Sequence, residues 1–384
     1  MAEKVTEKNS GLAYQQVLTN SATHGIVRQS EYFDRIVAGK NHLDAYYVVN
    51  PNDYVYNPRI SKEAPCGPIN RNTLELTGIA SPLYLVFRVS SQSLAYEFLD
   101  QYFKTANWFN YMKLQGNSGA RSDRFTIADT DFFSMPVRIP SLPEQRRIGE
   151  FFSAIDNLIA AAERQEALLR QKKQAYLQLM FPKEGETEPL VRFAGFNEQW
   201  QQRQLGEVAE IVGGGTPDSS NADYWDGDID WYIPSEIGES RIVQASARKI
   251  TREGLNHSSA RLLPAGSILF TSRASIGLMA FISHPSATNQ GFQSLIPNGE
   301  VDPDFLYALG PCISRYAKKH AAGSTFIEIS GSSLAKAPLR IPRLPEQRLI
   351  GQLFSTFDKI ISAAEQQIES LQMSKAAYLQ RMFI

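Results

Sequence analysis

Cysteine is scarce in this chain: only Cys66 and Cys312 occur among its 384 residues. They lie far apart and in no metal-ligand spacing, which argues against a disulfide framework and a zinc site and favours a reducing compartment. Histidine is almost as rare, and no histidine has a second ligand at helical spacing; the five are His24, His42, His257, His284 and His320. We therefore expect no metal site.

Long apolar runs are also absent. No stretch approaches the roughly 20 residues needed to cross a bilayer, and the polar N-terminus does not resemble a signal peptide. We expect a cytoplasmic protein with no membrane partner. A hydrophobic fraction of 43% with 21% charged residues is typical of a folded chain that can hold two or more domains. The net charge of −1 excludes a nonspecific polycation, but local basic faces can still bind DNA.

Catalytic motifs are missing as well. The glycine-rich turn at 213–217 lacks the spacing of a phosphate loop or a dinucleotide fingerprint. The aspartates at 223, 226, 228 and 230 do not follow the order of a calcium loop. Asn57-Pro58-Arg59 is only a near miss to the tetrad of amino-methyltransferases, and no nucleophile and base can be paired from the sequence. We predict a chain with no catalytic site, metal or cofactor of its own.

What the chain does contain is an internal repeat. Residues 136–181 align with 338–383 at a constant offset of 202 without a gap, and 27 of the 46 positions are identical. Pro143 and Pro345 suit a first helical turn, and Glu144 and Glu346 follow near the positive end of the helix dipole. Each copy therefore predicts a helix of about 39 residues, roughly 58 Å long at 1.5 Å per residue.

An apolar stripe with a seven-residue period runs along both predicted helices. Helices this long exceed the usual range of about 8–20 residues, so we expect the two to pair with each other as an antiparallel intramolecular coiled coil. One lysine interrupts each stripe at the same position and is expected to set the register. The predicted interface consists of Phe152, Ile155, Ile159, Ala162, Leu169, Lys173, Tyr176, Met180, Phe354, Phe357, Ile361, Ala364, Leu371, Lys375, Tyr378 and Met382.

A polar linker at 182–190 divides the chain into two halves. The fold class is α+β: two mixed α/β domains, 1–135 and 191–337, each followed by a conserved helical segment, 136–181 or 338–383, with an internal pseudo-two-fold. Strand-like runs at 54–56, 83–89 and 267–271 alternate with helical stretches at 93–108 and 303–319. Residues 196–207 precede the first expected strand of the second half, and the first domain looks shortened at its N-terminus by comparison.

The two domains share a sparse pattern of polar turns. A buried strand ending in a turn with one arginine occurs at 53–59 and again at 266–273, and Gly/Ser loops occur at 116–121 and 322–325. Arginine, amide and hydroxyl side chains are those that contact base edges and phosphates. Any single turn is more often structural, but their recurrence favours DNA contact. The candidates are Asn57, Arg59, Ser81, Asn117, Ser118, Arg121, Arg124, Thr216, Ser272, Arg273, Ser275, Asn289, Gln290, Ser324 and Thr325.

The motif Pro-x-Leu-Pro-Glu-Gln-Arg-x-Ile-Gly occurs at 140–149 and at 342–351, each time after a domain-sized stretch. With the turn at 213–217, Tyr224-Trp225 and the run at 287–290, it resembles the specificity subunit of type I restriction-modification enzymes. The resemblance spans nearly the whole chain. It implies two target-recognition domains that each read half of a split site in double-stranded DNA, separated by the paired helices.

The same resemblance implies two modification subunits that carry S-adenosylmethionine, and restriction subunits that use ATP and magnesium. None of that chemistry is expected of this chain. Two other classes remain open: a scaffold or decoy that binds modification subunits without reading DNA, and a self-sufficient enzyme. Copurification with a methyltransferase subunit, sequence-specific binding by the complex and activity of the chain alone would separate them.

Overall fold

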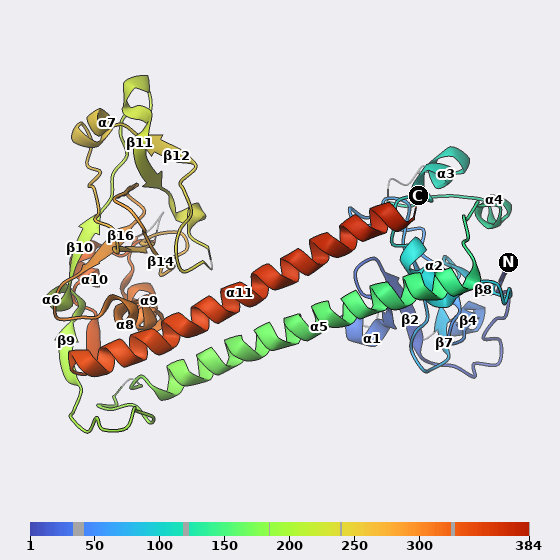
Figure 1. The fold of residues 1–384 in the computed structure, drawn as a ribbon, viewed down its shortest axis with the longest axis horizontal. Coiled ribbons are helices and arrows are strands. Elements are labelled where there is room, and N and C mark those ends of the chain that lie inside the picture. Colours follow the sequence, from blue (N-terminus) through green and yellow to red (C-terminus); the bar gives the residue numbers. More distant parts are fainter. Residues whose placement is uncertain (34–41, 118–122, 184, 239, 324–326, 384) are drawn as a thin grey trace. The chain divides into compact units, whose positions relative to one another are not determined.

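The computed structural model describes residues 1–33, 42–117, 123–183, 185–238, 240–323 and 327–383. The chain divides into two units (Figure 1). Unit 1 comprises Met1–Ala161 and Ile368–Ile384, and unit 2 comprises Ala162–Gln367. Two long helices, α5 (Leu142–Leu179) and α11 (Leu344–Met382), each contribute part of their length to both units. The predicted long helices are therefore confirmed.

Unit 1 contains two four-stranded sheets. The first has the order β1 (Ala2–Lys4), β8 (Leu85–Val89), β5 (Tyr54–Tyr56) and β6 (Ile69–Arg71), and every pairing is antiparallel. The second has the order β3 (Gly25–Arg28), β2 (Val17–Ser21), β7 (Gly78–Ala80) and β4 (Tyr47–Val49). The shorter helices are α1 (Gln29–Tyr32), η1 (Leu43–Ala45), α2 (Tyr96–Tyr102), α3 (Phe109–Gln115) and α4 (Asp129–Phe133).

Unit 2 contains three sheets. The largest has the order β10 (Ala209–Gly213), β16 (Gln293–Pro297), β13 (Ile268–Phe270) and β14 (Met279–Phe281). The others are β12 (Arg248–Ile250), β11 (Trp225–Tyr232) and β15 (Ala287–Thr288), and the pair β17 (Pro338–Ile341) and β9 (Gln201–Gln204). The helices are α6 (Leu205–Val208), η2 (Ala222–Tyr224), η3 (Pro234–Glu236), α7 (Arg252–Asn256), α8 (Pro303–Ala308), α9 (Gly310–His320) and α10 (Gly331–Leu334).

The main sheets of the two units have the same strand order. Order β1-β8-β5-β6 in unit 1 matches β10-β16-β13-β14 in unit 2, so the central strands β5 and β13 correspond, as the turns at 53–59 and 266–273 predicted. One expectation about the second half is wrong. Residues 196–207 do not merely precede its first strand, because they contain β9, which pairs with β17. Residues 136–139 of unit 1 are equivalent to β17 at the offset of 202, and they form no strand in the described part of unit 1.

The glutamine of the repeated motif anchors each long helix to its domain in the same way. In unit 1, Gln145 Oε1 accepts from the Ala95 N–H at 2.9 Å, and its Nε2 donates to the Ser93 and Pro140 carbonyls at 2.9 Å. In unit 2, Gln347 Oε1 accepts from the Asp302 N–H at 2.9 Å, and its Nε2 donates to the Glu300 and Pro342 carbonyls at 3.3 and 2.9 Å. Both side chains are buried, and their own polar atoms are satisfied by these bonds.

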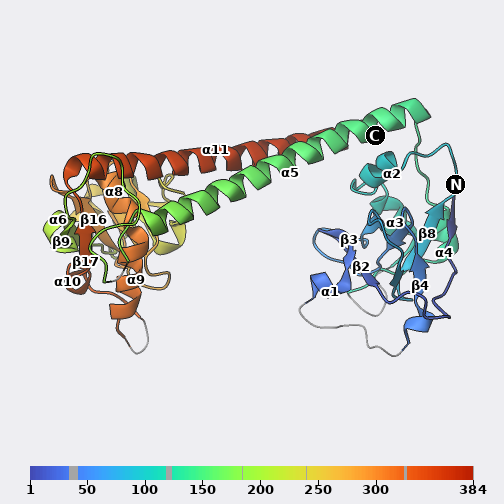
Figure 2. The same cartoon turned by 90° about the horizontal axis from the view of Figure 1, so that it is seen from below.

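The motif's glycine lets the long helix approach a shorter helix of the domain. A Cβ on Gly149 would lie 2.4 Å from Glu97 Cβ in α2, and a Cβ on Gly351 would lie 2.6 Å from Asp302 Oδ1 at the start of α8. Side chains at both positions would force the helices apart. Figure 2 shows α8 beside the first part of α11 in unit 2, and α2 near the first part of α5 in unit 1.

Aromatic rings complete each anchor. In unit 1, Phe383 packs against Phe98 and Phe152 with ring centroids 5.2 and 6.0 Å apart. In unit 2, Phe181 packs against Phe305 and Phe354 at 5.6 and 5.7 Å. The final phenylalanine of each helical repeat therefore packs in the core against the start of the other long helix, which explains why both copies end in phenylalanine.

An ion pair fixes the end of the linker in unit 2. Arg192 donates to both carboxylate oxygens of Glu346 at 2.9 and 2.8 Å and to the Glu198 carbonyl at 2.9 Å. Glu346 is only 1% exposed, and its hydrogen bonds raise the pKa of Arg192. Glu144, at the same motif position in unit 1, is exposed. Identical motif residues therefore have different environments.

No described helix is both long and apolar enough to cross a membrane. A search of the described residues also finds no group of three or more His, Cys, Asp or Glu side chains that could hold a metal ion.

Candidate nucleic-acid interface

A groove of about 720 Å³ in unit 1 brings together four of the predicted DNA contacts. Asn57, Arg59, Ser81 and Arg124 all line it. Arg59 and Arg124 lie on neighbouring segments joined by an antiparallel β-bridge, so two guanidinium groups reach the same groove. Neither has an ion pair within the described residues. Two cations without a carboxylate partner in one groove suit a polyanion.

Asparagine side chains shape the wall of this groove. Asn57 Nδ2 donates to the Asn20 carbonyl at 2.9 Å, and Asn57 Oδ1 accepts from the Arg59 N–H at 3.0 Å. Buried Asn20 donates to the Val55 carbonyl at 2.6 Å and accepts from Asn70 Nδ2 at 2.7 Å. The amide of Asn57 thus holds the turn that carries Arg59. Asn20 and Asn70 were missed by sequence reasoning, because no motif marks a network that forms between strands.

The predicted contacts of unit 2 gather around Gly291. Thr216 Oγ1 donates to Gln290 Oε1 at 2.5 Å, and Asn289 Oδ1 accepts from the Gly291 N–H at 2.8 Å. A Cβ on Gly291 would lie 3.2 Å from Arg273 Nε. A Cβ on Gly214 would lie 2.0 Å from the Asn289 carbonyl oxygen. The glycine-rich turn is therefore required by close packing on this polar cluster.

The remaining candidates differ in accessibility. Ser272 is fully buried and donates to Glu328 Oε1 at 3.2 Å, so its hydroxyl is turned away from any duplex. Ser275 and Asn117 are exposed, Arg273 is half-exposed, and Ser81 Oγ accepts from the Leu83 N–H at 3.3 Å. Ser118, Arg121, Ser324 and Thr325 lie outside the described residues.

The bases of the two Gly/Ser loops correspond. In unit 1, Asn117 bridges to Thr126 while Arg59 bridges to Arg124. In unit 2, Ala322 and Arg273 both bridge to Glu328. Each arginine-bearing turn is therefore bridged to the segment that also pairs with a residue of its own Gly/Ser loop, residues 124–126 in unit 1 and Glu328 in unit 2. The sparse pattern found in the sequence reflects a shared arrangement.

A second hollow, of about 420 Å³, lies in unit 2. Its lining includes basic side chains that were not among the predicted contacts: Lys183, Arg315, Lys319, His320 and Arg340. Arg315 and Arg340 have no ion pair among the residues that the structure describes. His320 stacks on Tyr316 with ring centroids 4.0 Å apart. The run Lys318-Lys319-His320 at the end of α9 was the available signal. Arg315 and Arg340 both line this one hollow, and two guanidinium groups there favour an anionic ligand such as a phosphodiester.

The long helices pack antiparallel within each unit. In unit 2, Lys173 pairs with Asp358 and Tyr176 packs on Phe357, so partner numbers fall as α5 numbers rise. In unit 1, Phe151 packs on Tyr378 and Asp156 pairs with Lys375. The two ion pairs map onto each other at the offset of 202, whereas Tyr176 and Tyr378 pack on residues that do not correspond.

Most of the predicted interface residues are buried or half-buried, and the exceptions are Tyr176, Tyr378 and Met382, which are 40%, 44% and 38% exposed. The predicted interface did not include Asp156 and Asp358, which form ion pairs with Lys375 and Lys173. Burial opposes ionisation of Asp156, but the hydrogen bond from Lys375 and the charges of Lys104 and Lys375 outweigh it and lower the pKa of Asp156.

Comparison with known proteins identifies relatives of this chain. A sequence profile for the type I restriction modification DNA specificity domain matches residues 197–373. The type I restriction enzyme MjaIX specificity subunit of Methanocaldococcus jannaschii is 35% identical over 189 residues, which cover 48% of this chain and 44% of that protein. The EcoR124I/EcoR124II specificity subunit of Escherichia coli is 28% identical over 271 residues, covering 67% of this chain and 63% of that protein. The chain thus spans about half to under two thirds of these two relatives.

A solved structure resembles the whole chain in fold. The S subunit of a type I restriction-modification system from M. genitalium aligns with a TM-score of 0.60 at 13% identity, covering 100% of this chain and 93% of that chain. At this identity the likeness concerns the fold alone. It agrees with the predicted arrangement of mixed domains and long helices.

Proposed function

We propose that the chain is a specificity subunit of a type I restriction-modification system, as the sequence profile over residues 197–373 and the two relatives support, and that it recognises a bipartite sequence in double-stranded DNA. Each recognition domain would read one half-site. The observation that carries this proposal is the shared arrangement of the two domains. Equivalent central strands, β5 and β13, lead into turns that carry Arg59 and Arg273.

The chemistry of these turns suits base reading. Arginine can donate two hydrogen bonds to guanine, while amides can bind adenine in the same way. Arg59 and Arg124 would act in the first domain, and Arg273, Asn289 and Gln290 in the second. The basic hollow lined by Arg315 and Arg340 would contact phosphates, which adds affinity without sequence information.

We further propose that the paired helices bind two modification subunits, and that restriction subunits join this assembly. S-adenosylmethionine, ATP and magnesium would belong to those partners, which are expected in the cytoplasm. This chain would contribute no catalytic group. The decoy reading finds no support, because both domains carry equivalent cationic turns and the relatives are specificity subunits.

The proposal is tested by Arg59→Ala and Arg273→Ala, each made in the full chain and assembled with its modification subunits. Binding is measured on duplexes in which each base of the two half-sites is varied in turn. Each variant is expected to lose about 1–3 kcal/mol of discrimination at one position of its own half-site. Exposed arginines outside the long helices provide the controls: Arg138→Ala in unit 1 and Arg252→Ala in unit 2. Unchanged preferences at both half-sites would contradict the assignment.

A further inference from the structure

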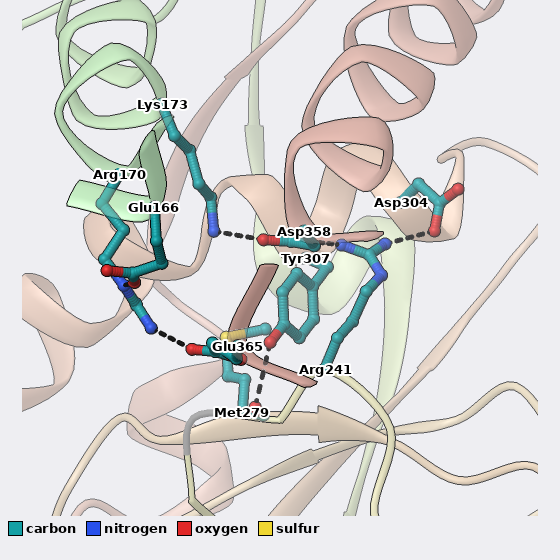
Figure 3. A network of polar contacts seen from close by, with 9 residues as sticks. All are labelled: Glu166, Arg170, Lys173, Arg241, Met279, Asp304, Tyr307, Asp358 and Glu365. Carbon is teal, nitrogen blue, oxygen red and sulfur yellow. Dashed lines mark hydrogen bonds and ion pairs between the residues drawn. The ribbon is translucent and has the colours of Figure 1, made fainter. Parts of the chain in front are cut away.

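One carboxylate in unit 2 joins three parts of the structure. Asp358 of α11 accepts from Lys173 Nζ of α5 at 2.5 Å and from Arg241 Nη1 of the recognition domain at 2.6 Å (Figure 3). The side chains of Asp358 and Arg241 are only 14% and 13% exposed. The two oxygens of Asp358 thus have different partners: one holds the helix pair together, and the other holds the domain to α11.

Arg241 is fixed on the domain side of this junction. Its guanidinium also donates to Asp304 in α8 and lies over the rings of Tyr307 and Phe281, 4.4 and 4.9 Å from their centroids. The main chain is held as well, because Phe281 of β14 donates to the Arg241 carbonyl at 2.8 Å. Tyr307 in turn donates to the Met279 carbonyl at 3.2 Å. Arg241 therefore moves only if the edge of the main sheet moves.

A hollow of about 980 Å³ lies between this segment and the helices. It is lined by residues 240–242 and 244 of the segment and by parts of α5 and α11. Arg241 and Asp358 both line it. The ion pair consequently links the two walls of a groove that apolar packing does not close.

Unit 1 contains a junction at the equivalent helix position. Asp156 lies 202 residues before Asp358, and its partner Lys375 lies 202 residues after Lys173. A second cation again comes from the domain: Lys104, which follows α2, lies 3.5 Å from Asp156 Oδ2. Lys104 and Arg241 do not correspond in the sequence or in the fold. Helix duplication explains the aspartate and the seam lysine, but each diverged domain supplies its own second cation.

We propose that Asp156 and Asp358 are positioning residues, and that Lys104 and Arg241 are the contacts by which each domain is oriented on the helix pair. This inference rests on the proposed function, because the orientation of a domain would set the spacer length that the complex accepts between half-sites. Removing Arg241 leaves Asp358 paired with Lys173 and leaves the Gln347 and Phe181 anchors in place, so the domain stays attached but loses its ion pair with α11.

The test compares Arg241→Met with the unaltered chain, each assembled with modification subunits. The probes are duplexes carrying the half-sites of the unaltered complex, with its own spacer or with a spacer changed by a single base pair. Discrimination between spacers is expected to fall by about tenfold, as for a broken half-buried ion pair, while half-site preferences stay the same. Arg241→Lys should restore part of the discrimination, because lysine serves at the equivalent junction in unit 1. The control Arg252→Met changes an exposed arginine of α7, outside the helix pair, and should leave spacer discrimination unchanged.

Spacer discrimination equal to that of the unaltered chain would overturn the inference. An equal loss of affinity on every spacer, accompanied by a lower melting temperature, would also overturn it, since that result indicates a packing role only. If the unaltered complex itself shows no sequence-specific binding, the proposed function fails, and this inference fails with it.

Discussion

Replacing Gln347 with leucine is predicted to destabilise the attachment of α11 to its domain by about 3 kcal/mol, because three hydrogen bonds contribute about 1 kcal/mol each. Leucine keeps much of the side-chain volume but leaves the N–H of Asp302 without its acceptor in a buried site. Amide hydrogen exchange measures the effect locally, which matters in a chain of two units. Exchange at Asp302 should become about 150-fold faster, the equivalent of about 3 kcal/mol.

The duplication supplies a second test of the same reasoning. Gln145→Leu should produce a similar acceleration at Ala95 in unit 1, since its side chain makes the same three bonds. Gln352→Leu, on the exposed face of α11, is the matched control and should change neither amide. An acceleration of exchange below about fivefold corresponds to less than the free energy of one hydrogen bond and would refute the anchoring role. Uniform acceleration across the unit would instead show that the substitution loosens the whole core.

Three further predictions follow from the contacts described above. Glu346→Gln should cost about 1–3 kcal/mol in thermal or urea unfolding because it breaks a buried ion pair, whereas Glu144→Gln at the exposed counterpart should cost at most about 1 kcal/mol; equal effects would contradict the difference in burial. Arg315→Ala combined with Arg340→Ala should reduce the slope of log affinity against log salt by about 2 without changing sequence preference; an unchanged slope would remove the phosphate assignment. Inserting four residues after Ala162 should alter the spacer in methylation maps of the complex, and altered half-sites would oppose this.

The long helices were predictable because their information is local and appears twice. Proline, glutamate and an apolar stripe mark each start and each buried face, and a constant offset of 202 confirms the duplication. The central strands β5 and β13 were also predictable, since each is a short apolar run that ends in a polar turn with an arginine. Strand β9 was not, because its sequence, four polar residues from Gln201 to Gln204, becomes a strand only by pairing with β17.

The site was less predictable than the fold. The role of Gln145 depends on main-chain groups at 93–95, which lie in the part of the domain that has diverged between halves. Asn57 and Ser272 have side chains of the right type for DNA contact, but one supports a turn and the other is buried. Residue type indicates what a side chain can bind, whereas its neighbours in space determine whether it is free to do so.

Mapping of methylated adenines in a host that expresses this chain with its modification subunits tests the central claim most directly. The account predicts one new motif made of two defined half-sites separated by a spacer of fixed length and variable sequence. A continuous motif, or a pattern of methylation identical to that of a host without this chain, would contradict it.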